Sequence, residues 1–293
     1  MIETAIIPVA GLATRFLPVS KEVPKALMPV LNKPMIQFAI EEAYFSGIRR
    51  ILIILGPGQS SIKDYLQNDY ATSIKKHISF KNYKLENFIE ITNSIQIDYV
   101  VQKKPLGLGH AILEAESYIG TNSFSIFLPD DLIFNDSPCM LDMINIYEEF
   151  SVPVLAIKEV SSKKIPFLGI IDGDKYKERI YQITKMIEKP TLENAPSNLA
   201  IIGRYVLPSG IFSELKHIKP GANGEIQITD ALIRFMKHAG FYGYKFPGVH
   251  FDVGNPLGLL QASVYTAAAD PDIAKDFVNW IYSNVEDFKF NVK

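Results

Sequence analysis

The sequence has little that would cross-link or anchor it. Only one of its 293 residues is a cysteine, Cys139, so no intrachain disulfide can form, and no Cys/His cluster has the spacing of zinc ligands. We expect Cys139 to be a core or surface thiol rather than a nucleophile. No apolar run approaches the ~20 residues that a membrane helix needs, and the N-terminus lacks the features of a signal peptide. These absences predict a cytoplasmic protein that does not act at a membrane.

The sequence also has little net charge and lacks two common phosphate-binding motifs. Thirty Lys and Arg residues against 32 Asp and Glu leave a formal net charge of −2. Without an overall basic field we expect no nucleic-acid partner, so an anionic substrate needs local positive charge. The sequence contains no GxxxxGK[ST] loop, and no GxGxxG follows its first strand-like segment. A nucleotide would therefore be bound in another way.

The sequence does contain a regular alternation of strand-like and helix-like segments. Residues 4–9 and 51–55 are near-continuous apolar runs, typical of parallel strands that are buried on both faces. A helical pattern that begins at Pro34 and ends before Gly47 lies between them. The alternation continues with a helix around His110 and with strands at 96–101, 123–131 and 152–160. This order predicts an α/β fold with a doubly wound, mostly parallel mixed sheet.

The remaining segments are less uniform. Residues 67–94 are rich in Lys, Asn and Tyr, and we expect a surface excursion there. Beyond residue 160 the pattern changes to shorter strands, followed by helices at 228–240 and 256–269. The sequence that starts at Asp270 is amphipathic and predicts a C-terminal helix that covers a sheet edge or a partner chain.

The loop after the first strand carries the clearest chemical signal. Gly11 lets backbone N–H groups approach a phosphate, Arg15 adds a forked donor, and Lys25 adds a point charge between two prolines. In doubly wound sheets, ligands bind at the carboxyl ends of the strands, where this loop and the pair Asp130–Asp131 both lie. A solvated turn with two surface cations and a solvated strand end are the alternative readings.

The segment PVAGLATRFLPVSKEVPKALMPVLNKP resembles the signature of bacterial UTP–glucose-1-phosphate uridylyltransferases, a branch of the sugar nucleotidyltransferase family, GxGTRxxPxTKxxPKxxLP. Further matches follow in the family's order: QKKPLGLGHAI, FLPDD, LGIID, EKP, APSNLAIIGRYVL, GEIQITDAL and FDVGNPLG. The resemblance spans roughly residues 3 to 265. It implies a Rossmann-like nucleotidyltransferase fold with a smaller sugar-binding lobe. It also implies the transfer of a uridylyl group from UTP to glucose 1-phosphate, which gives UDP-glucose and pyrophosphate with Mg²⁺ as cofactor.

The same resemblance implies a role for each matching residue. Arg15 and Lys25 would be the catalytic cations that hold the triphosphate, with Lys25 near the reacting phosphorus. Asp130 and Asp252 would bind Mg²⁺. The substrate-binding residues would be Ala10 and Gly11 for the nucleotide, Gln102 and Gly107 for the uracil, Gly169, Glu188, Asn198 and Gly203 for the sugar, and Lys189 for its phosphate.

The resemblance also implies one nucleotidyltransferase domain over residues 1–293. Its nucleotide-binding half would be at about 1–135, and its sugar-binding and C-terminal helical half at about 136–293. Relatives are commonly oligomeric, which implies a homodimer or homotetramer.

Several of these residues also have plainer readings that involve no substrate. They are an exposed ion pair for Glu188 and Lys189, a turn for Asp252, a solvated strand end for Gln102, packing or capping for His110, and core or interface for Trp280.

Two positions depart from the family pattern. Ala13 occupies the place of the second signature glycine, and it would cost about 1–2 kcal/mol if the loop requires a positive φ there. Leu168 precedes Gly169 where the family usually has tyrosine. These departures leave two alternatives open. One is a same-fold enzyme that uses dTTP or another sugar phosphate, and the other is a low-activity regulatory paralogue that binds nucleotide sugar.

Overall fold

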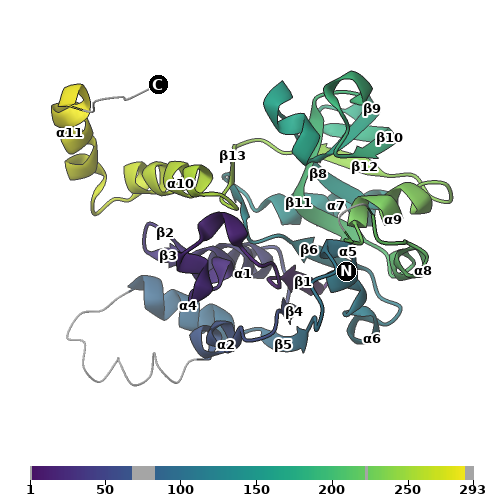
Figure 1. Cartoon of the computed structure of the whole chain (residues 1–293), viewed down its shortest axis with the longest axis horizontal. Coiled ribbons are helices and arrows are strands. Elements are labelled where there is room, and N and C mark those ends of the chain that lie inside the picture. The colour runs from purple at the N-terminus through teal and green to yellow at the C-terminus, as the bar shows by residue number, and fades with distance from the viewer. Residues whose placement is uncertain (1, 68–82, 222–223, 288–293) are drawn as a thin grey trace.

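A mixed α/β fold is observed in the computed structural model, which describes residues 2–67, 83–221 and 224–287 (Figure 1). Within these residues nine strands form one sheet. In spatial order they are β5 (Gln96–Val101), β4 (Arg50–Leu55), β1 (Thr4–Pro8), β6 (Phe124–Phe127), β11 (Leu199–Leu207), β8 (Val154–Glu159), β12 (Tyr242–Lys245), β10 (Ile180–Glu188) and β9 (Gly169–Lys177). The α/β prediction is thus confirmed.

The sheet is parallel only in part. Neighbours from β5 to β6 run parallel, and β1 and β4 among them have the continuous apolar sequences that predict this. From β11 onward the pairings are antiparallel, except that β12 runs parallel to β8. The prediction of a mostly parallel sheet is therefore wrong for this second part. Two residues, 178 and 179, join β9 to β10, and a connection that short imposes an antiparallel hairpin.

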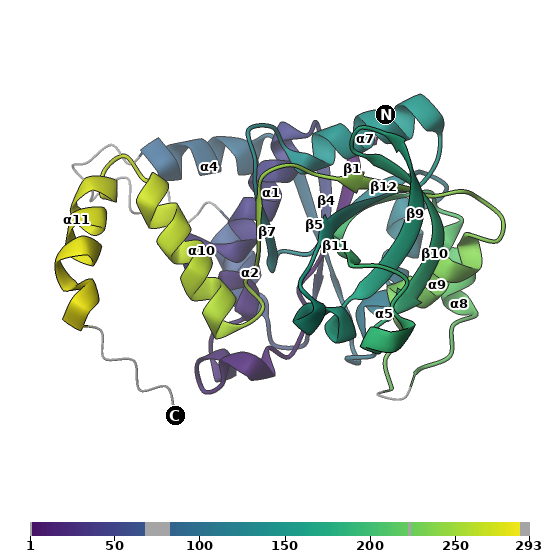
Figure 2. The same ribbon diagram turned by 90° about the horizontal axis from the view of Figure 1, so that it is seen from above.

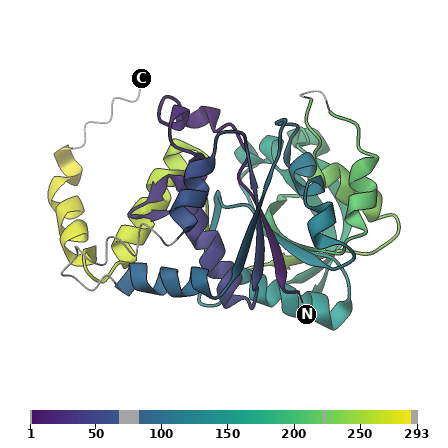
Figure 3. The ribbon, with the colours of Figure 1, turned by 90° about the horizontal axis from the view of Figure 1, so that it is seen from below.

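Helices cover both faces of the sheet, as Figures 2 and 3 show. Alternate residues of β1 explain why: Ala5 and Ile7 point into one core, and Ile6 points into the other. The first core is closed by α1 (Met35–Phe45), α2 (Ser60–Leu66), α4 (Tyr83–Asn93) and α7 (Cys139–Phe150). The second is closed by α5 (Leu108–Leu113), α6 (Glu116–Ile119), α8 (Ile211–Lys216) and α9 (Ile228–Phe235).

The structure revises one sequence expectation and confirms another. Part of the expected surface excursion at 67–94 is helix α4, which buries Phe88 and Ile91 at 5% and 6% exposure. Residues 68–82 of that excursion lie outside the described residues. Cys139 is 1% exposed in α7, and burial, together with the charge of Glu42, raises its pKa well above the ordinary value. The thiol is therefore a core group, as expected, and stays protonated.

Two short ribbons and a third core place the opening loop. The ribbons pair β7 (Asp131–Phe134) with β13 (Val249–Asp252) and β2 (Pro29–Val30) with β3 (Lys33–Pro34). Three 3₁₀ turns shape the loop after β1, namely η1 (Thr14–Phe16), η2 (Val19–Lys21) and η3 (Lys25–Leu27). Phe16 and Met28 of this loop pack with Leu132 of β7 and Val253 beside β13. The loop is thereby fixed against the ribbon that carries Asp252.

The C-terminal helices extend away from the sheet (Figure 1). Helix α10 (Pro256–Ala269) is capped by Asn255, whose side chain accepts the Gly258 N–H at 2.9 Å. Helix α11 (Ala274–Asn284) follows and buries none of its residues; Trp280 is 52% exposed and Tyr282 78%. Coverage of a sheet edge is therefore wrong for α11, and the core reading of Trp280 is wrong as well. No helix of the described part has the length and apolarity to span a membrane.

Candidate active site

The loop after β1 forms one wall of a cavity of about 460 Å³. Residues Ala10 to Thr14 line it, so Ala10 and Gly11 border the cavity, and the predicted contact of their backbone with a nucleotide stays a prediction. The opposite wall comes from the start of α5 and from residues 225 and 227. Of the predicted site residues, this cavity brings together Ala10, Gly11, Lys25, Gln102, Gly107 and Asp130.

Ala13 has a left-handed backbone, with φ 51° and ψ 37°. In this conformation the loop turns into η1, where the Phe16 N–H donates to the Ala13 carbonyl at 3.0 Å. An L-residue with a Cβ pays about 1–2 kcal/mol for such a conformation. The loop therefore does use a positive φ at the position of the second signature glycine, and alanine strains it.

We expect Ala13→Gly to raise the free energy of unfolding by up to about 1 kcal/mol, because relief of the strain exceeds the roughly 0.5–1 kcal/mol of added backbone entropy. Urea denaturation measures it. Ser151→Gly is the matched control, since Ser151 has φ 54° at the end of α7, far along the chain from the loop. Stabilisation by Ser151→Gly but not by Ala13→Gly would contradict strain at Ala13.

Gln102 and Gly107 lie side by side in this cavity. The Gln102 amide donates to the Gly107 carbonyl at 3.1 Å and lies 3.0 Å from Nδ1 of His110. Gln102 is 3% exposed, so the reading of a solvated strand end is wrong. His110 packs at the start of α5, as the plainer reading predicts, with its other ring nitrogen 3.6 Å from Glu114.

Glu225 and Gln227 line the same cavity and were missed as site residues. Ile226 between them donates its N–H to the Leu106 carbonyl at 2.7 Å and accepts the Gly109 N–H at 2.8 Å. Gly107 permits this approach, because a Cβ there would lie 2.8 Å from Cβ of Glu225. The sequence offered one signal, the matching segment GEIQITDAL, but no local pattern places that segment against residues more than 100 positions earlier.

Lys25 and Asp130 form an ion pair at the edge of the cavity. Nζ of Lys25 lies 2.7 Å from Oδ2 of Asp130, and about a quarter of each side chain is exposed. Lys25 is held by η3, which Pro24 precedes, and Asp130 follows β6 at the carboxyl end of that strand. The opening loop and the strand-end carboxylate therefore meet, as their common edge of the sheet predicts.

Asp252 completes a pair of carboxylates with Asp130. A Cβ at Gly254 would lie 2.8 Å from Oδ2 of Asp130 and 2.9 Å from Oδ1 of Asp252, so both carboxylates border the space that this glycine leaves open. The Val253 N–H, which donates to the Asp130 carbonyl at 2.8 Å, fixes the two segments together. Two carboxylates beside an open space fit a hard divalent cation, which takes oxygen ligands. Asp252 also accepts the Gly254 N–H at 2.9 Å, so it forms the predicted turn as well.

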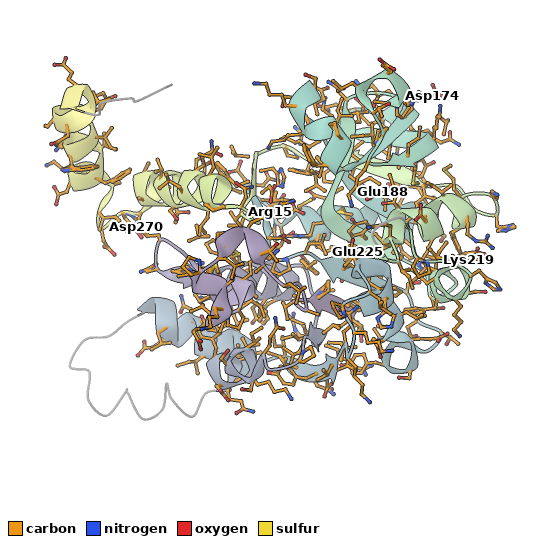
Figure 4. The ribbon with its side chains drawn as sticks, viewed as in Figure 1. Arg15, Asp174, Glu188, Lys219, Glu225 and Asp270 are labelled. Atoms are coloured by element: carbon orange, nitrogen blue, oxygen red, sulfur yellow. The ribbon has the colours of Figure 1, made fainter. Side chains whose placement is uncertain are left out.

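A second cavity of about 560 Å³ adjoins the first at Leu128 and Asp130. Arg15 and Asp252 line it, together with Lys163 and Lys164 of the 3₁₀ turn η4 (Ser162–Phe167). Figure 4 shows Arg15, Glu188 and Glu225 near the middle of the molecule, whereas Asp174, Lys219 and Asp270 lie at its periphery. The carboxylate pair thus stands between two cavities.

Asp131 and His250 form a contact that the sequence reading missed. Oδ1 of Asp131 lies 2.6 Å from Nε2 of His250, and Oδ2 accepts the Gly203 N–H at 3.1 Å. Burial opposes the charge on Asp131, but the hydrogen bond and charge of His250, with Arg204 and the Gly203 N–H, hold the pKa of Asp131 below its usual value. Asp131 is therefore ionised, and each of its two carboxylate oxygens already has a hydrogen-bond partner.

Arg204 and Glu42 form a buried ion pair behind the site. Nε and Nη2 of Arg204 donate to Oε2 of Glu42 at 3.1 and 2.8 Å, and Nη1 donates to the Leu128 carbonyl at 3.0 Å. Glu42 also accepts the Met140 N–H at 3.1 Å. The pair connects α1, α7 and β11 to the segment that leads to Asp130.

We expect Arg204→Met to lower the free energy of unfolding by about 3–5 kcal/mol, because it leaves the Glu42 carboxylate buried without its partner. Urea denaturation measures the change. The control is Lys216→Met, which breaks the Lys216–Glu116 pair at 2.6 Å, where both side chains are exposed. Such surface pairs contribute little. Equal effects of the two variants would contradict the assigned role of Arg204.

The predicted sugar-binding residues lie around the start of β9. Gly169 is paired with Glu188, and a Cβ at Gly169 would lie 3.2 Å from Oε2 of Glu188. Lys189 forms an ion pair with Glu188 at 3.3 Å, but only the lysine side chain is exposed, at 43% against 18% for Glu188, so the plainer reading of an exposed pair holds only in part. The Asn198 carbonyl accepts the Val160 N–H at 3.0 Å. These residues line neither cavity described above, and their roles stay predictions.

Gly203 lies apart from this group. A Cβ there would lie 2.5 Å from both Oδ2 of Asp131 and Cβ of Leu128. The glycine therefore lets β11 approach the segment that follows β6. This packing alone requires glycine at 203, and contact with a sugar stays a prediction.

The chain belongs to the nucleotidyl transferase family, whose sequence model matches residues 4–269. A UTP–glucose-1-phosphate uridylyltransferase of Staphylococcus haemolyticus (strain JCSC1435) is 39% identical over 280 residues, which cover 96% of this chain and 97% of that protein. One from Bacillus subtilis (strain 168) is 36% identical over 96% of this chain and 94% of its own. The chain is thus similar over nearly its whole length to enzymes of that name.

Two solved structures resemble this fold closely. A UDP-glucose pyrophosphorylase complexed with UDP-glucose is 39% identical, with a TM-score of 0.86 over 92% of this chain and 100% of that one. A UTP-bound UGPase from Acinetobacter baumannii is 32% identical, with a TM-score of 0.84 over 96% of this chain and 99% of its own. The predicted membership of this family is confirmed.

Proposed function

We propose that the protein transfers a uridylyl group from UTP to the phosphate of glucose 1-phosphate, giving UDP-glucose and pyrophosphate. One observation carries this proposal: Lys25 and the carboxylates of Asp130 and Asp252 meet where two cavities join, so a nucleotide and a second phosphorylated substrate have adjoining places around them. The relatives named above support UTP and glucose 1-phosphate as the pair of substrates.

UTP is assigned to the first cavity. The backbone N–H groups of Ala10 and Gly11 would approach the nucleotide, because a glycine-containing loop presents them without obstruction. The uracil would lie by Gln102 and Gly107, where the buried Gln102 amide donates to the Gly107 carbonyl. The triphosphate would extend toward Lys25 and Arg15.

Mg²⁺ is assigned to Asp130 and Asp252. Mg²⁺ usually takes one or two carboxylates, with phosphate oxygens and waters as its other ligands. When bound, it supplies charge that stabilises the transition state of the displacement at the α-phosphorus. Lys25, which pairs with Asp130, would turn to the triphosphate, and this exchange of partners would leave the Asp130 carboxylate for the cation.

The chemistry consists of holding anions together. A triphosphate and a phosphomonoester bring roughly six negative charges, and one Mg²⁺ with Arg15, Lys25 and Lys189 supplies about five positive charges. The second pKa of the sugar phosphate is near 6, so its oxygen is already ionised at neutral pH and needs no general base. Positioning and electrostatic stabilisation of an in-line displacement are then sufficient.

The sugar is assigned to the start of β9, next to Leu168, which lines the second cavity. Gly169, Glu188 and Asn198 would line it, together with Gly203, which lies apart from them on β11, and Lys189 would hold its phosphate. Support comes from the pairing of Gly169 with Glu188, which leaves a carboxylate beside a residue without a side chain, an arrangement suited to sugar hydroxyls. Lys189 already faces that carboxylate.

We also propose that the enzyme is a homodimer or homotetramer that uses the face of α10 and α11. Exposed apolar side chains gather on these two helices, and they include Leu257, Leu260, Trp280 and Tyr282. A patch of that kind typically marks an interface. Light scattering of the full chain gives the mass directly, and a monomer at micromolar concentration would contradict the proposal.

A panel of nucleotides tests the function. Pyrophosphate release from UTP, dTTP and CTP, each with glucose 1-phosphate and Mg²⁺, should be fastest with UTP. Faster release from dTTP would favour the thymidylyl alternative. Binding of UDP-glucose without release from any of the three would favour a regulatory paralogue.

A further inference from the structure

Three carboxylates, not two, line the second cavity: Asp130, Asp131 and Asp252. Asp130 and Asp252 border the open space at Gly254, whereas Asp131 is hydrogen-bonded to His250 and to the Gly203 N–H. Among the described residues, no three acidic, histidine or cysteine side chains are placed to hold one ion together. Asp131 therefore does not join the other two.

The ribbon of β7 and β13 places Asp131 next to Asp252. Asp131 stands directly opposite Asp252 in the antiparallel register, and side chains in such pairs lie about 5 Å apart on one face. Two like charges in that arrangement repel each other. His250 lies two residues before Asp252, hence on the same face, and diagonally from Asp131. It supplies the hydrogen-bond donor for Oδ1 of Asp131.

We propose that His250 is a positioning residue that holds Asp131 away from the metal and so keeps the number of carboxylate ligands at two. This inference rests on the metal site in the proposed function. Two carboxylates leave coordination positions for the phosphate oxygens of the nucleotide. A released Asp131 would add a third carboxylate, which would strengthen binding of the bare cation and occupy a position that a phosphate oxygen needs.

Three features suggest that Asp131, once released from His250, would turn to the metal. It is largely buried, with 19% of its side chain exposed, so water does not satisfy it fully once His250 is removed. Gly203 supplies one backbone donor to one of its oxygens only. The remaining oxygen would then be free to turn within the cavity that Asp130 and Asp252 also line, and a cation held by these two would be one of its possible partners.

The test is titration of Mn²⁺ into the full chain without nucleotide, followed by electron paramagnetic resonance of the free ion. We expect His250→Ala to bind Mn²⁺ about tenfold more tightly than the wild type, while the Mg²⁺ dependence of turnover shifts and kcat falls. His250→Leu, which keeps the side-chain volume without the donor, should show the same gain. His250→Gln, which retains an N–H donor, should restore wild-type binding.

The double variant His250→Ala, Asp131→Asn separates this role from simple support of the fold. A neutral amide is a poor third ligand, so Mn²⁺ affinity should return to the wild-type value. His238→Ala is the matched control, since His238 is exposed and lines neither cavity. Unchanged Mn²⁺ affinity in both His250→Ala and His250→Leu, or a gain that persists in the double variant, would overturn the proposal.

Failure of the proposed function gives a different result. The Mn²⁺ titration contains no substrate, so it reads the carboxylate count whatever nucleotide the enzyme uses. A wild type that releases no pyrophosphate from UTP would refute the function and leave the comparison of variants intact.

Discussion

Lys25→Ala should lower kcat by about 10²–10³-fold and change the KM for UTP only a few-fold. The magnitude is that of losing one preorganised charge at a reacting centre. The effect falls on kcat because the charge of Lys25 matters most when negative charge develops in the transition state. Steady-state kinetics with saturating Mg²⁺ measures both constants.

The control for this variant is Lys21→Ala. Lys21 lies in the same loop, is exposed, and lines neither cavity, so its removal should leave kcat near the wild-type value. Asp130 is already about a quarter exposed, so Lys25→Ala should remain folded. A near-normal kcat in Lys25→Ala would remove Lys25 from the catalytic role.

Asp252→Asn should abolish most of the metal-dependent activity, with a loss of at least about 10²-fold in kcat, while the fold stays intact. Asparagine still has an oxygen that accepts the Gly254 N–H, so the turn that Asp252 forms at 2.9 Å is retained. The negative charge is lost, together with the 3.2 Å hydrogen bond that Oδ2 accepts from the Asn255 amide, which keeps its other bond to the Asp252 carbonyl at 3.1 Å. The variant thus separates the turn-forming reading of Asp252 from its reading as a metal ligand.

The measurement is activity against Mg²⁺ concentration, together with the melting temperature. Asp174→Asn is the control, since Asp174 is exposed on β9 at the periphery of the molecule (Figure 4). An Asp252→Asn enzyme with wild-type activity and a wild-type requirement for Mg²⁺ would leave Asp252 with the turn alone.

The parallel part of the sheet was predictable because its signal is local. Strands such as β1 and β4 are buried on both faces, so their apolar runs are continuous, and the helix between them has its own start and stop signals. The antiparallel part was not predictable in the same way. β11 is buried along its whole length as well, yet it lies antiparallel between β6 and β8, and only tertiary packing decides that direction.

In the candidate site, too, some contacts could be predicted from the sequence and others could not. Lys25 and Asp130 follow strands whose carboxyl ends share an edge, so their meeting follows from the predicted topology. His250 and Arg204 were missed because each acts on residues 76 or more positions away, and neither has a local pattern that names its partner. Ala13 was recognised as a departure by comparison with the family signature, and its φ of 51° turned that departure into a strained position.

The assignment of the first cavity to a nucleotide depended on the resemblance more than on physical reasoning. Gln102 alone reads as a polar strand end, and nothing in its neighbourhood predicts 3% exposure. Its assignment came from the segment QKKPLGLGHAI in its place among the other matching segments. The contacts of its buried amide with Gly107 and His110 support the assignment.

The central claim is that this chain joins UTP to glucose 1-phosphate with a metal held by Asp130 and Asp252. The most direct measurement is mass spectrometry of the products after the full chain has been incubated with UTP, glucose 1-phosphate and Mg²⁺. We predict UDP-glucose and pyrophosphate in equal amounts, and neither product when EDTA is present. UDP-glucose formation that continues undiminished in EDTA, or no UDP-glucose with Mg²⁺ present, would contradict the claim.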